Sequence, residues 1–514
     1  MGNTKKSVLF ICADQWRWDC FGFMGHKHAH TPTIDKLASR STAFTKHFTN
    51  IIPCGPSRAT MLTGLYPFIH RSVVNGAPLD ERFTNIALEV KKLGYDPTLY
   101  GYTDTSYDPR KLDKNDPRLF TYESPMPGFD PVCHLPHGNP KPWASYLEKK
   151  GIKVEKPNDL YNCPAAKNNE GFVYKAWKIP TELSDTSYLA DRAASDLKNS
   201  KEPFFMHISF LKPHPPYCVS DPWHSLIDPS KLESDILDES KAYREKLHPL
   251  SEKIIESFEI KGNKTPEINY SKLTKKDIAK IQAVYLGMCA EVDFNIKKIL
   301  KALDDSGQAN NTMIIFTSDH GEMLGQHWMF GKKGWWDQSY RIPLIISTPN
   351  CKPQFINEMT ESVDLAPTII DWLGGEVPVD WNGRSLISNV ENGESKLPNR
   401  EYVIFEWDFR DLYQNKDSKK LTLAPEECNL AVIRSKEWKY VHFPAFDPLL
   451  YNIKNDPNEK VNLASDPQYD KIKTEMLSKL LSHRIRHSER QMTNIKLTSK
   501  GPRASHGPTI RQIL

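Results

Sequence analysis

Two pairs of neighbouring polar residues in this chain have the chemistry of metal ligands. Asp14 and Gln15 follow one short apolar run, and Asp319 and His320 follow another. Together they offer carboxylate, amide oxygen and imidazole but no thiolate, which suits a divalent ion such as Ca²⁺, Mg²⁺ or Mn²⁺, and the imidazole favours Mn²⁺. Either pair alone is better explained as a helix cap or an ordinary turn. Two pairs at the ends of two strands favour a metal site.

The run CGPSRATMLTG, residues 54–64, could hold an anion at the start of a helix. Pro56 suits the first turn of a helix and Gly64 its end. Cys54 would then lie at the helix N-terminus, where free N–H groups and the helix dipole favour negative charge. Arg58 lies one turn further on and could reach the same anion with its planar guanidinium. The alternative is a buried structural cysteine, which is the usual role of an arbitrary cysteine.

Two further apolar runs also end in polar residues. Lys212-Pro213-His214 follows one of them, and Gly101-Tyr102-Thr103-Asp104 follows the other. Ligands of open α/β sheets bind beyond the carboxyl ends of the strands. We therefore expect these polar residues at the same edge of a sheet as the two pairs above.

The runs that precede these residues lack the alternation of a half-buried strand. They consist almost wholly of apolar residues, as strands buried on both faces of a parallel sheet do. The runs are Val8–Ala13, Thr98–Tyr100, Phe204–Leu211, Met313–Thr317 and Ile342–Ser347. Apolar residues at three- and four-residue spacing from Ile278 to Leu303 predict a helix that ends at Gly307, and residues 185–197 predict another. Helices that alternate with strands indicate an α/β fold, with a parallel sheet sandwiched by helices.

The pattern changes near residues 388–400, a polar stretch. Beyond it we expect a strand, a folded pair of antiparallel strands and a closing helix, over residues 402–406, 430–443 and 469–487. From residue 488 the chain is polar and mildly basic, and it is either without fixed structure or an arm that packs on another subunit. We therefore predict a large α/β domain, a small α+β domain and a C-terminal arm, over residues 1–390, 400–487 and 488–514.

Composition restricts the class of protein. The chain has 514 residues, more than the roughly 250–300 that one core holds, so a large domain plus a smaller one is the default. The net charge is 68 − 64 = +4, too small to indicate nucleic acid as a partner. No apolar run approaches the roughly 18 residues of a membrane helix, and Val8–Ala13 is too short for a secretory signal. Nine cysteines without a C-x-x-C pair do not read as a disulfide framework, so we expect a cytoplasmic protein with no membrane partner.

The run from Cys54 to Gly64 resembles the sulfatase signature C-x-P-S-R-x-x-x-L-T-G at every specified position. The resemblance implies an alkaline-phosphatase-like fold, and oxidation of Cys54 to Cα-formylglycine (3-oxoalanine) by a separate maturation enzyme. The hydrated aldehyde would attack the sulfur or phosphorus of an ester, and its second hydroxyl would let the covalent adduct collapse with release of sulfate or phosphonate. A plain serine or thiol lacks that second hydroxyl.

The resemblance extends along nearly the whole chain. Residues 31–37, 318–322, 331–332, 341–344 and 450–463 look like further sulfatase motifs. Within the superfamily the likeness is to the phosphonate monoester hydrolase and arylsulfatase group. The stretches that carry it are Asp14-Gln15, Gly101-Tyr102-Thr103, Asp108-Pro109-Arg110, Lys212-Pro213-His214-Pro215-Pro216, Gly383-Arg384-Ser385-Leu386 and Asp408-Phe409-Arg410-Asp411. Enzymes of this group often act on both sulfur and phosphorus esters, and the sequence does not decide between them.

The resemblance also implies roles for individual residues. One divalent ion, Mn²⁺ or Ca²⁺, would be held by Asp14, Gln15, Asp319, His320 and the modified residue 54. A small anionic ester would be converted by the catalytic residues Cys54, Arg58, His214 and Lys332 and bound by Asn75 and Tyr102. Arg58 and Lys332 would neutralise its non-bridging oxygens, and His214 would protonate or hydrogen-bond the leaving oxygen. The family likeness and the polar C-terminal arm suggest a homotetramer.

Two positions depart from the family pattern. Many sulfatases carry a second aspartate where this chain has Gln15, and choline-sulfatase-like enzymes share the glutamine. Asp104 stands where we expect a hydroxyl residue in the phosphonate hydrolases. If its side chain points into the pocket, it would repel an anionic substrate or attract a cationic substituent. Two alternatives stay open: a choline-sulfatase-like alkylsulfatase, and a non-enzyme that binds metal and anion with Cys54 unmodified.

Overall fold

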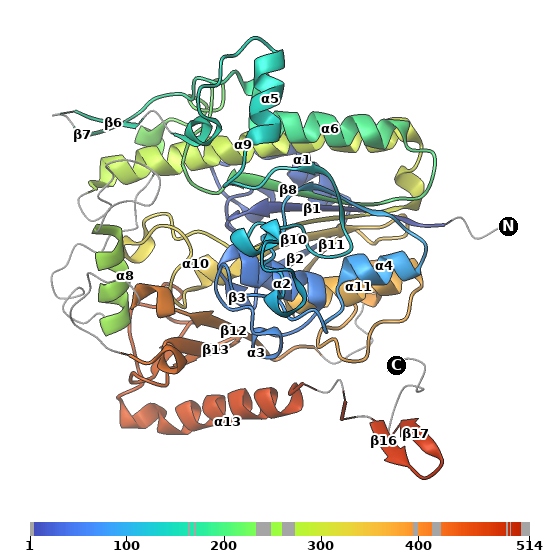
Figure 1. Ribbon diagram of the computed structural model, residues 1–514. Coiled ribbons are helices and arrows are strands. Elements are labelled where there is room, and N and C mark those ends of the chain that lie inside the picture. The colour runs from blue at the N-terminus through green and yellow to red at the C-terminus, as the bar shows by residue number, and fades with distance from the viewer. Residues whose placement is uncertain are drawn as a thin grey trace.

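The computed structural model describes residues 5–162, 165–168, 171–232, 248–259, 273–393, 399–413, 423–489, 492–493 and 495–504. Its centre is an eight-stranded sheet with helices on both faces, and a smaller sheet lies beside it, covered by one long helix (Figure 1). This confirms the predicted fold, a sheet sandwiched by helices with a smaller α+β part.

The central sheet has the strand order β11-β2-β10-β9-β1-β8-β4-β5. In that order its strands span Gln354–Glu361, Thr42–Phe48, Arg341–Ser347, Thr312–Ser318, Ser7–Asp14, Phe205–Pro213, Pro97–Gly101 and Asp130–His134. All five predicted apolar runs are strands of this sheet, namely β1, β4, β8, β9 and β10. Strand β1 lies inside the sheet and pairs in parallel with both β8 and β9.

One predicted strand runs in the opposite direction to its neighbours. Strand β10 pairs antiparallel with both β9 and β2, so the parallel sheet expected from the apolar runs is wrong for residues 342–347. Between β9 and β10 the chain forms only a short 3-10 turn and the helix α10 (Asp337–Tyr340). Neither element is a helix that carries the chain back along the sheet to the other end of β9, as a parallel neighbour needs, so β10 starts near the end at which β9 stops. A strand buried on both faces is apolar in either direction, so composition does not reveal the direction.

Alternate residues of β1 enter two separate cores. The odd-numbered residues Leu9 to Ala13 pack against helices on one face, α1 (Pro32–Ser39), α6 (Asp185–Asn199) and α9 (Lys275–Ser306). The even-numbered residues Val8 to Cys12 pack against helices on the other face, α2 (Cys54–Thr63), α4 (Ile86–Lys92) and α11 (Leu365–Leu373). Figure 1 shows these two sets of helices on opposite sides of the sheet. Because both faces are covered, β1 carries no polar residue from Val8 until Asp14, at the edge where the site forms.

Helix α9 follows the predicted course. It begins after Thr274, whose hydroxyl accepts from the N–H of Asp277 while the Asp277 carboxylate accepts from the N–H of Thr274. It ends at Gly307, which adopts the left-handed conformation at φ 77°. A glycine is favoured there because that conformation strains a residue with a Cβ.

The second sheet has the strand order β15-β14-β13-β12-β3. In that order its strands span Leu449–Asn452, Trp438–His442, Asn429–Ser435, Tyr402–Asp408 and Ile51–Ile52. The strands expected in the C-terminal part are β12, β13 and β14, and the expected closing helix is α13 (Asp470–Arg486). Strand β3 comes from the N-terminal part of the chain and pairs in parallel with β12. The domain boundaries stay predictions, and residues 394–398 of the polar stretch between them lie outside the described residues.

The remaining elements are short. They are α3 (Pro67–His70), α5 (Lys141–Lys149), β6 (Ala165–Asn168), β7 (Gly171–Tyr174), α8 (Pro249–Glu259), α12 (Ile387–Asn392), β16 (Ile495–Thr498) and β17 (Gly501–Ala504). Strands β16 and β17 form a hairpin within the predicted C-terminal arm, beyond the end of α13 (Figure 1). Residues 505–514 of that arm lie outside the described residues. Among the helices that are described, none combines the length and the apolar content needed to cross a bilayer.

Candidate metal and anion site

The carboxyl ends of β1 and β9 bring the first predicted ligands together. The two strands pair in parallel with Ala13 opposite Ser318, so Asp14 and Asp319 follow side by side. The backbone N–H of Gln15 donates to Asp319 Oδ1 over 3.0 Å, which fixes the turn after β1. Gln15 has a φ of 68° there, in the left-handed region that residues other than glycine rarely adopt.

Helix α2 brings Cys54 to the same place. The helix starts at Cys54 and ends at Gly64, which is left-handed at φ 63°, as the sequence predicts. All of its residues are buried, and the helix packs against the central sheet, against strand β3 of the second sheet and against helix α11. Ser57 Oγ donates to the carbonyl oxygen of Asp319 over 2.5 Å. This hydrogen bond ties the first turn of the helix to the end of β9.

Arg58 lies beneath the two carboxylates. Its Nε donates to Asp319 Oδ2 over 3.0 Å, and its Nη2 donates to Asp14 Oδ2 over 3.3 Å. Its Nη1 donates to Ser209 Oγ over 2.6 Å and to the carbonyl oxygen of Tyr102 over 3.0 Å. The side chain is fully buried and does not line the pocket described below. It holds the carboxylates in place, and its expected contact with a substrate oxygen stays a prediction.

Four side chains above Arg58 form a compact donor set. Asp14, Cys54, Asp319 and His320 each offer a ligand atom, and these atoms lie within 4.8 Å of one another. His320 Nδ1 lies 3.0 Å from the carbonyl oxygen of Gly321, which can only accept. Nδ1 therefore carries the proton, and Nε2 presents its lone pair to the cluster. Two carboxylates and an imidazole nitrogen in this arrangement fit one divalent ion.

Lys332 and Gln15 lie at the edge of this donor set. Lys332 Nζ donates to Gln15 Oε1 over 2.7 Å and lies 3.2 Å from Cys54 Sγ. Gln15 Nε2 donates to a carboxylate oxygen of Glu322, which fixes the orientation of the amide. The amide oxygen thus faces the cluster, and its expected role as a metal ligand stays a prediction.

The charges in the cluster shift one another's pKa values. Burial by itself would raise the pKa of Asp14, but Lys332, Arg58 and the hydrogen bond from Tyr102 outweigh burial and lower that pKa below its usual value. Burial would likewise lower the pKa of Lys332, but Cys54 and Asp14 raise it. The site therefore keeps a carboxylate and an ammonium group side by side.

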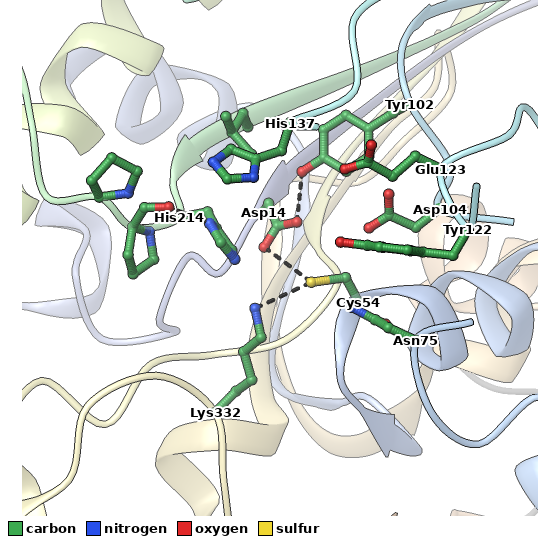
Figure 2. A pocket seen from close by; sticks show the side chains of 13 residues that line it. Asp14, Cys54, Asn75, Tyr102, Asp104, Tyr122, Glu123, His137, His214 and Lys332 are labelled. Carbon is green, nitrogen blue, oxygen red and sulfur yellow. Dashed lines mark hydrogen bonds between the residues drawn. The ribbon is translucent and has the colours of Figure 1, made fainter. Parts of the chain in front are cut away.

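The donor set opens into a pocket of about 210 Å³. Figure 2 shows Cys54 near its middle, with Lys332 and His214 on one side and Asp104 and Tyr122 on the other. The other residues that line it are Asp14, Asn75, Tyr102, Glu123, His137, Leu211, Pro215 and Pro216. The structure thus gathers four of the five expected substrate contacts around Cys54, and Arg58 is the exception.

Comparisons with known proteins agree with this geometry. The family profile described as Sulfatase matches residues 6–375. The chain belongs to the sulfatase family. A second profile, described as N-sulphoglucosamine sulphohydrolase, C-terminal, matches residues 325–486.

Individual relatives match this sulfatase-family chain from end to end. The crystal structure of phosphonate monoester hydrolase of Agrobacterium radiobacter superposes with a TM-score of 0.90 at 37% identity, covering 98% of this chain and 100% of that chain. A multifunctional alkaline phosphatase superfamily protein of Trinickia caryophylli is 35% identical over 510 residues, 97% of this chain and 99% of the relative. An arylsulfatase of Clostridium perfringens is 25% identical over 519 residues, 97% and 98% of the two chains. The resemblance predicted from the motifs is confirmed.

Two residues that are expected to contact the substrate, Tyr102 and Asn75, also form hydrogen bonds with other residues of this sulfatase-family site. The hydroxyl of Tyr102 donates to Asp14 Oδ2 over 2.6 Å, on the carboxylate oxygen that Arg58 also holds. Asn75 Oδ1 accepts from the N–H of Gly55 over 3.0 Å, which satisfies a free donor at the start of α2. Asn75 therefore has only its amide nitrogen left to donate to a substrate oxygen.

His214 is a neutral imidazole in this pocket. Burial, together with Lys332 and His137, lowers the pKa of His214 well below its usual value. Its Nδ1 lies 2.5 Å from the carbonyl oxygen of Pro215, so Nδ1 carries the proton and Nε2 is a hydrogen-bond acceptor. The expected proton donation by His214 stays a prediction, because it needs a second proton, at Nε2.

The sequence left one orientation open and missed three pocket residues. Asp104 points into the pocket (Figure 2), and burial, Asp14 and Glu123 raise the pKa of Asp104 to about 8. Tyr122, Glu123 and His137 were not predicted. His137 follows β5, an edge strand whose first residues are exposed, so no apolar run marks it. The one available signal is that His137 follows the carboxyl end of a strand, as the other site residues do.

Proposed function

We propose that this chain hydrolyses phosphonate monoesters, phosphodiesters and sulfate esters, with phosphonate monoesters preferred. The observation that carries the proposal is the place of Cys54, which begins a buried helix among the ligand atoms of Asp14, Asp319 and His320 and lines a pocket. The preference for phosphonates is supported by the 37% identity to a phosphonate monoester hydrolase along the whole chain, against 25% to an arylsulfatase.

A divalent metal ion and the modification of residue 54 would complete the site. Asp14, Gln15, Asp319 and His320 would hold one divalent ion, Mn²⁺ or Ca²⁺, which supplies a Lewis acid when bound. Residue 54, oxidised to formylglycine by a maturation enzyme, would supply the nucleophilic oxygen and the hydroxyl that releases the product. The surroundings of Cys54 Sγ fit an oxygen, because Lys332 Nζ lies 3.2 Å away and can donate a hydrogen bond.

The residues of this chain bind and orient the ester. Lys332 neutralises a non-bridging oxygen next to residue 54, and the amide nitrogen of Asn75 donates to another. An anionic ester beside His214 favours the protonated imidazole, because a nearby negative charge raises the pKa of a histidine. His214 would then give the proton on Nε2 to the leaving oxygen. Arg58 and Tyr102 keep Asp14 in position beneath.

The test compares p-nitrophenyl phenylphosphonate with p-nitrophenyl sulfate, which share a leaving group. The protein is loaded with metal, and residue 54 is identified as formylglycine from the mass of the tryptic peptide His47–Arg58. A higher kcat/KM for the phosphonate supports the proposal. A higher kcat/KM for the sulfate assigns the chain to sulfate esters, and turnover of neither ester contradicts the proposed hydrolysis.

The proposal includes a cytoplasmic homotetramer. The odd number of cysteines without a disulfide pattern supports the location. Three exposed apolar side chains at four-residue spacing on α13, Leu477, Leu481 and Ile485, support an interface between copies. We expect Leu481→Lys to dissociate the assembly in sedimentation equilibrium, and an unchanged tetramer would contradict this interface.

A further inference from the structure

One wall of the pocket carries two carboxyl groups that the metal and nucleophile sites do not use. Asp104 and Glu123 line the pocket beside Tyr122, and Lys332 and His214 lie across from them (Figure 2). Within the described ranges, no lysine or arginine forms an ion pair with Asp104, and no donor hydrogen-bonds to its carboxylate. Arg58 is a cation whose charge acts on Asp104, and its donors are directed at Asp14, Asp319, Ser209 and Tyr102.

The backbone holds Asp104 in this orientation. The N–H of Thr105 donates to the carbonyl oxygen of Ser124 over 3.0 Å, so the chain on one side of Asp104 is paired with the segment that carries Tyr122. On the other side, the Asp104 carbonyl oxygen packs so closely against Gly55 that a Cβ there would lie 2.9 Å from it. Asp104 itself has a φ of 49°, a left-handed conformation that aspartate tolerates better than most residues.

Glu123 is fixed as well. Its Oε1 accepts from the N–H of Gly138 over 2.8 Å, which ties it to the loop that carries His137. The pocket wall therefore combines two ordered carboxylates with the ring of Tyr122. An aromatic ring beside a carboxylate suits an ammonium group, because the ring quadrupole and the carboxylate charge both attract it. A second anion would meet like charge at the same place.

We propose that Asp104, with Tyr122 beside it, selects esters that carry a positively charged amino or quaternary ammonium substituent. The ester's own negative charge lies at residue 54 against Lys332, and the substituent's positive charge lies against Asp104. An ammonium group beside Asp104 lowers the pKa of that carboxyl from its raised value, so the carboxylate is ionised when the substituent is bound. The preferred substrate is therefore a zwitterion, with its two charges at opposite sides of the pocket. This inference rests on the proposed hydrolysis at residue 54.

The test uses two phosphonate monoesters of nearly equal shape, p-nitrophenyl aminoethylphosphonate and p-nitrophenyl propylphosphonate. They share the leaving group and the reaction, and they differ by an ammonium group in place of a methyl group. We expect the wild-type kcat/KM to favour the amino compound by about tenfold or more, as an ion pair with a cation–π contact would.

The ratio of the two kcat/KM values is then compared between variants. Asp104→Asn keeps the shape of the side chain and removes its charge, and we expect it to lower the ratio by about tenfold. Asp113→Asn is the matched control, because it removes the same charge from an exposed position that does not line the pocket, and it should leave the ratio unchanged. An equal ratio in the wild type and Asp104→Asn overturns the inference.

A binding measurement separates this inference from the proposed hydrolysis. Aminoethanesulfonate and propanesulfonate are not esters, so their dissociation constants, measured by calorimetry, do not depend on turnover. Tighter binding of the amino compound by the wild type, lost in Asp104→Asn, supports the role of Asp104 even if neither phosphonate is hydrolysed. Hydrolysis of both phosphonates with no preference in either assay overturns the role of Asp104 and leaves the proposed function in place.

Discussion

Arg58 donates from its Nε to Asp319 Oδ2 over 3.0 Å, beneath the metal-ligand cluster. Its Nη2 makes the corresponding contact with Asp14 Oδ2. The Oδ1 atoms of the two carboxylates therefore face the cluster, at 3.5 and 3.6 Å from His320 Nε2. Because the guanidinium is planar and rigid, one buried side chain sets the spacing of both carboxylates before an ion binds.

Replacing Arg58 should therefore weaken metal binding. Arg58→Lys keeps the positive charge but loses the planar fork, and we expect it to lower metal affinity by roughly 10–100-fold, as changes to residues that orient metal ligands do. Metal titration followed by calorimetry measures the effect. The matched control is Arg400→Lys, which alters another buried arginine, paired with Glu361 and Asp364 away from the cluster. Equal metal affinity in both variants would contradict the role assigned to Arg58.

Removal of the metal should lower stability as well as activity. A ligand that binds only the folded state stabilises it by about 4 kcal/mol when its free concentration is roughly 1,000 times its Kd. We expect chelation to lower the Tm of the wild type, and Mn²⁺ or Ca²⁺ to restore it. In His320→Ala the Tm should no longer respond to chelation, because the imidazole ligand is lost. A metal-dependent Tm in that variant would place the ion elsewhere.

Lys332 and Lys333 offer a direct comparison of neighbouring residues. Lys332 Nζ contacts Cys54 and Gln15, whereas Lys333 Nζ turns away and donates to Ser257. We expect Lys332→Met to lower kcat/KM for an aryl phosphonate by roughly 100-fold or more, because one donor to a developing negative charge is lost. Lys333→Met should stay within a few-fold of the wild type. Similar losses of kcat/KM in the two variants would contradict the catalytic role of Lys332.

The buried His207 predicts a pH dependence of stability. Burial and Arg58 lower the pKa of His207 to about 3, and its Nδ1 lies 3.1 Å from the carbonyl oxygen of Phe10. Below about pH 6.5 the unfolded chain binds a proton at His207 that the folded chain does not. The contribution of neutral His207 to the free energy of unfolding is therefore fully present above that pH and is lost as the pH falls. Between about pH 7 and pH 5 this loss is roughly 2 kcal/mol for one such histidine.

Urea unfolding at those two pH values measures the loss. His207→Asn keeps a donor toward Phe10 and should reduce the difference in unfolding free energy between the two pH values by roughly 2 kcal/mol. His30→Asn, at an exposed position, is the control and should leave the difference unchanged. A pH dependence in His207→Asn equal to that of the wild type would contradict the assignment.

Much of the fold could be predicted because its signals are local. Strand β1 is apolar from Val8 to Ala13 since both its faces are covered, and helix α2 shows its start and its end in the residues from Cys54 to Gly64. The direction of β10 could not be predicted, because it depends on the path of the chain between two strands and not on the composition of either.

The site was predicted to a similar extent, for a similar reason. The residues that follow apolar strands were found, since strand ends are visible in the sequence. The orientation of Asp104 depends on its φ of 49° and on the pairing of Thr105 with Ser124. That pairing joins two segments that no local sequence pattern connects. The partners of Arg58 could not be predicted either, because Asp14 and Asp319 reach it from two separate strands.

The most direct test of the account measures activity against the chemical state of residue 54. Preparations with different fractions of formylglycine, quantified by mass in the tryptic peptide His47–Arg58, are assayed on p-nitrophenyl phenylphosphonate at saturating metal. The account predicts that kcat/KM rises in proportion to the formylglycine fraction and is abolished in Cys54→Ala. Turnover that is independent of this fraction, or that persists in Cys54→Ala, would contradict it.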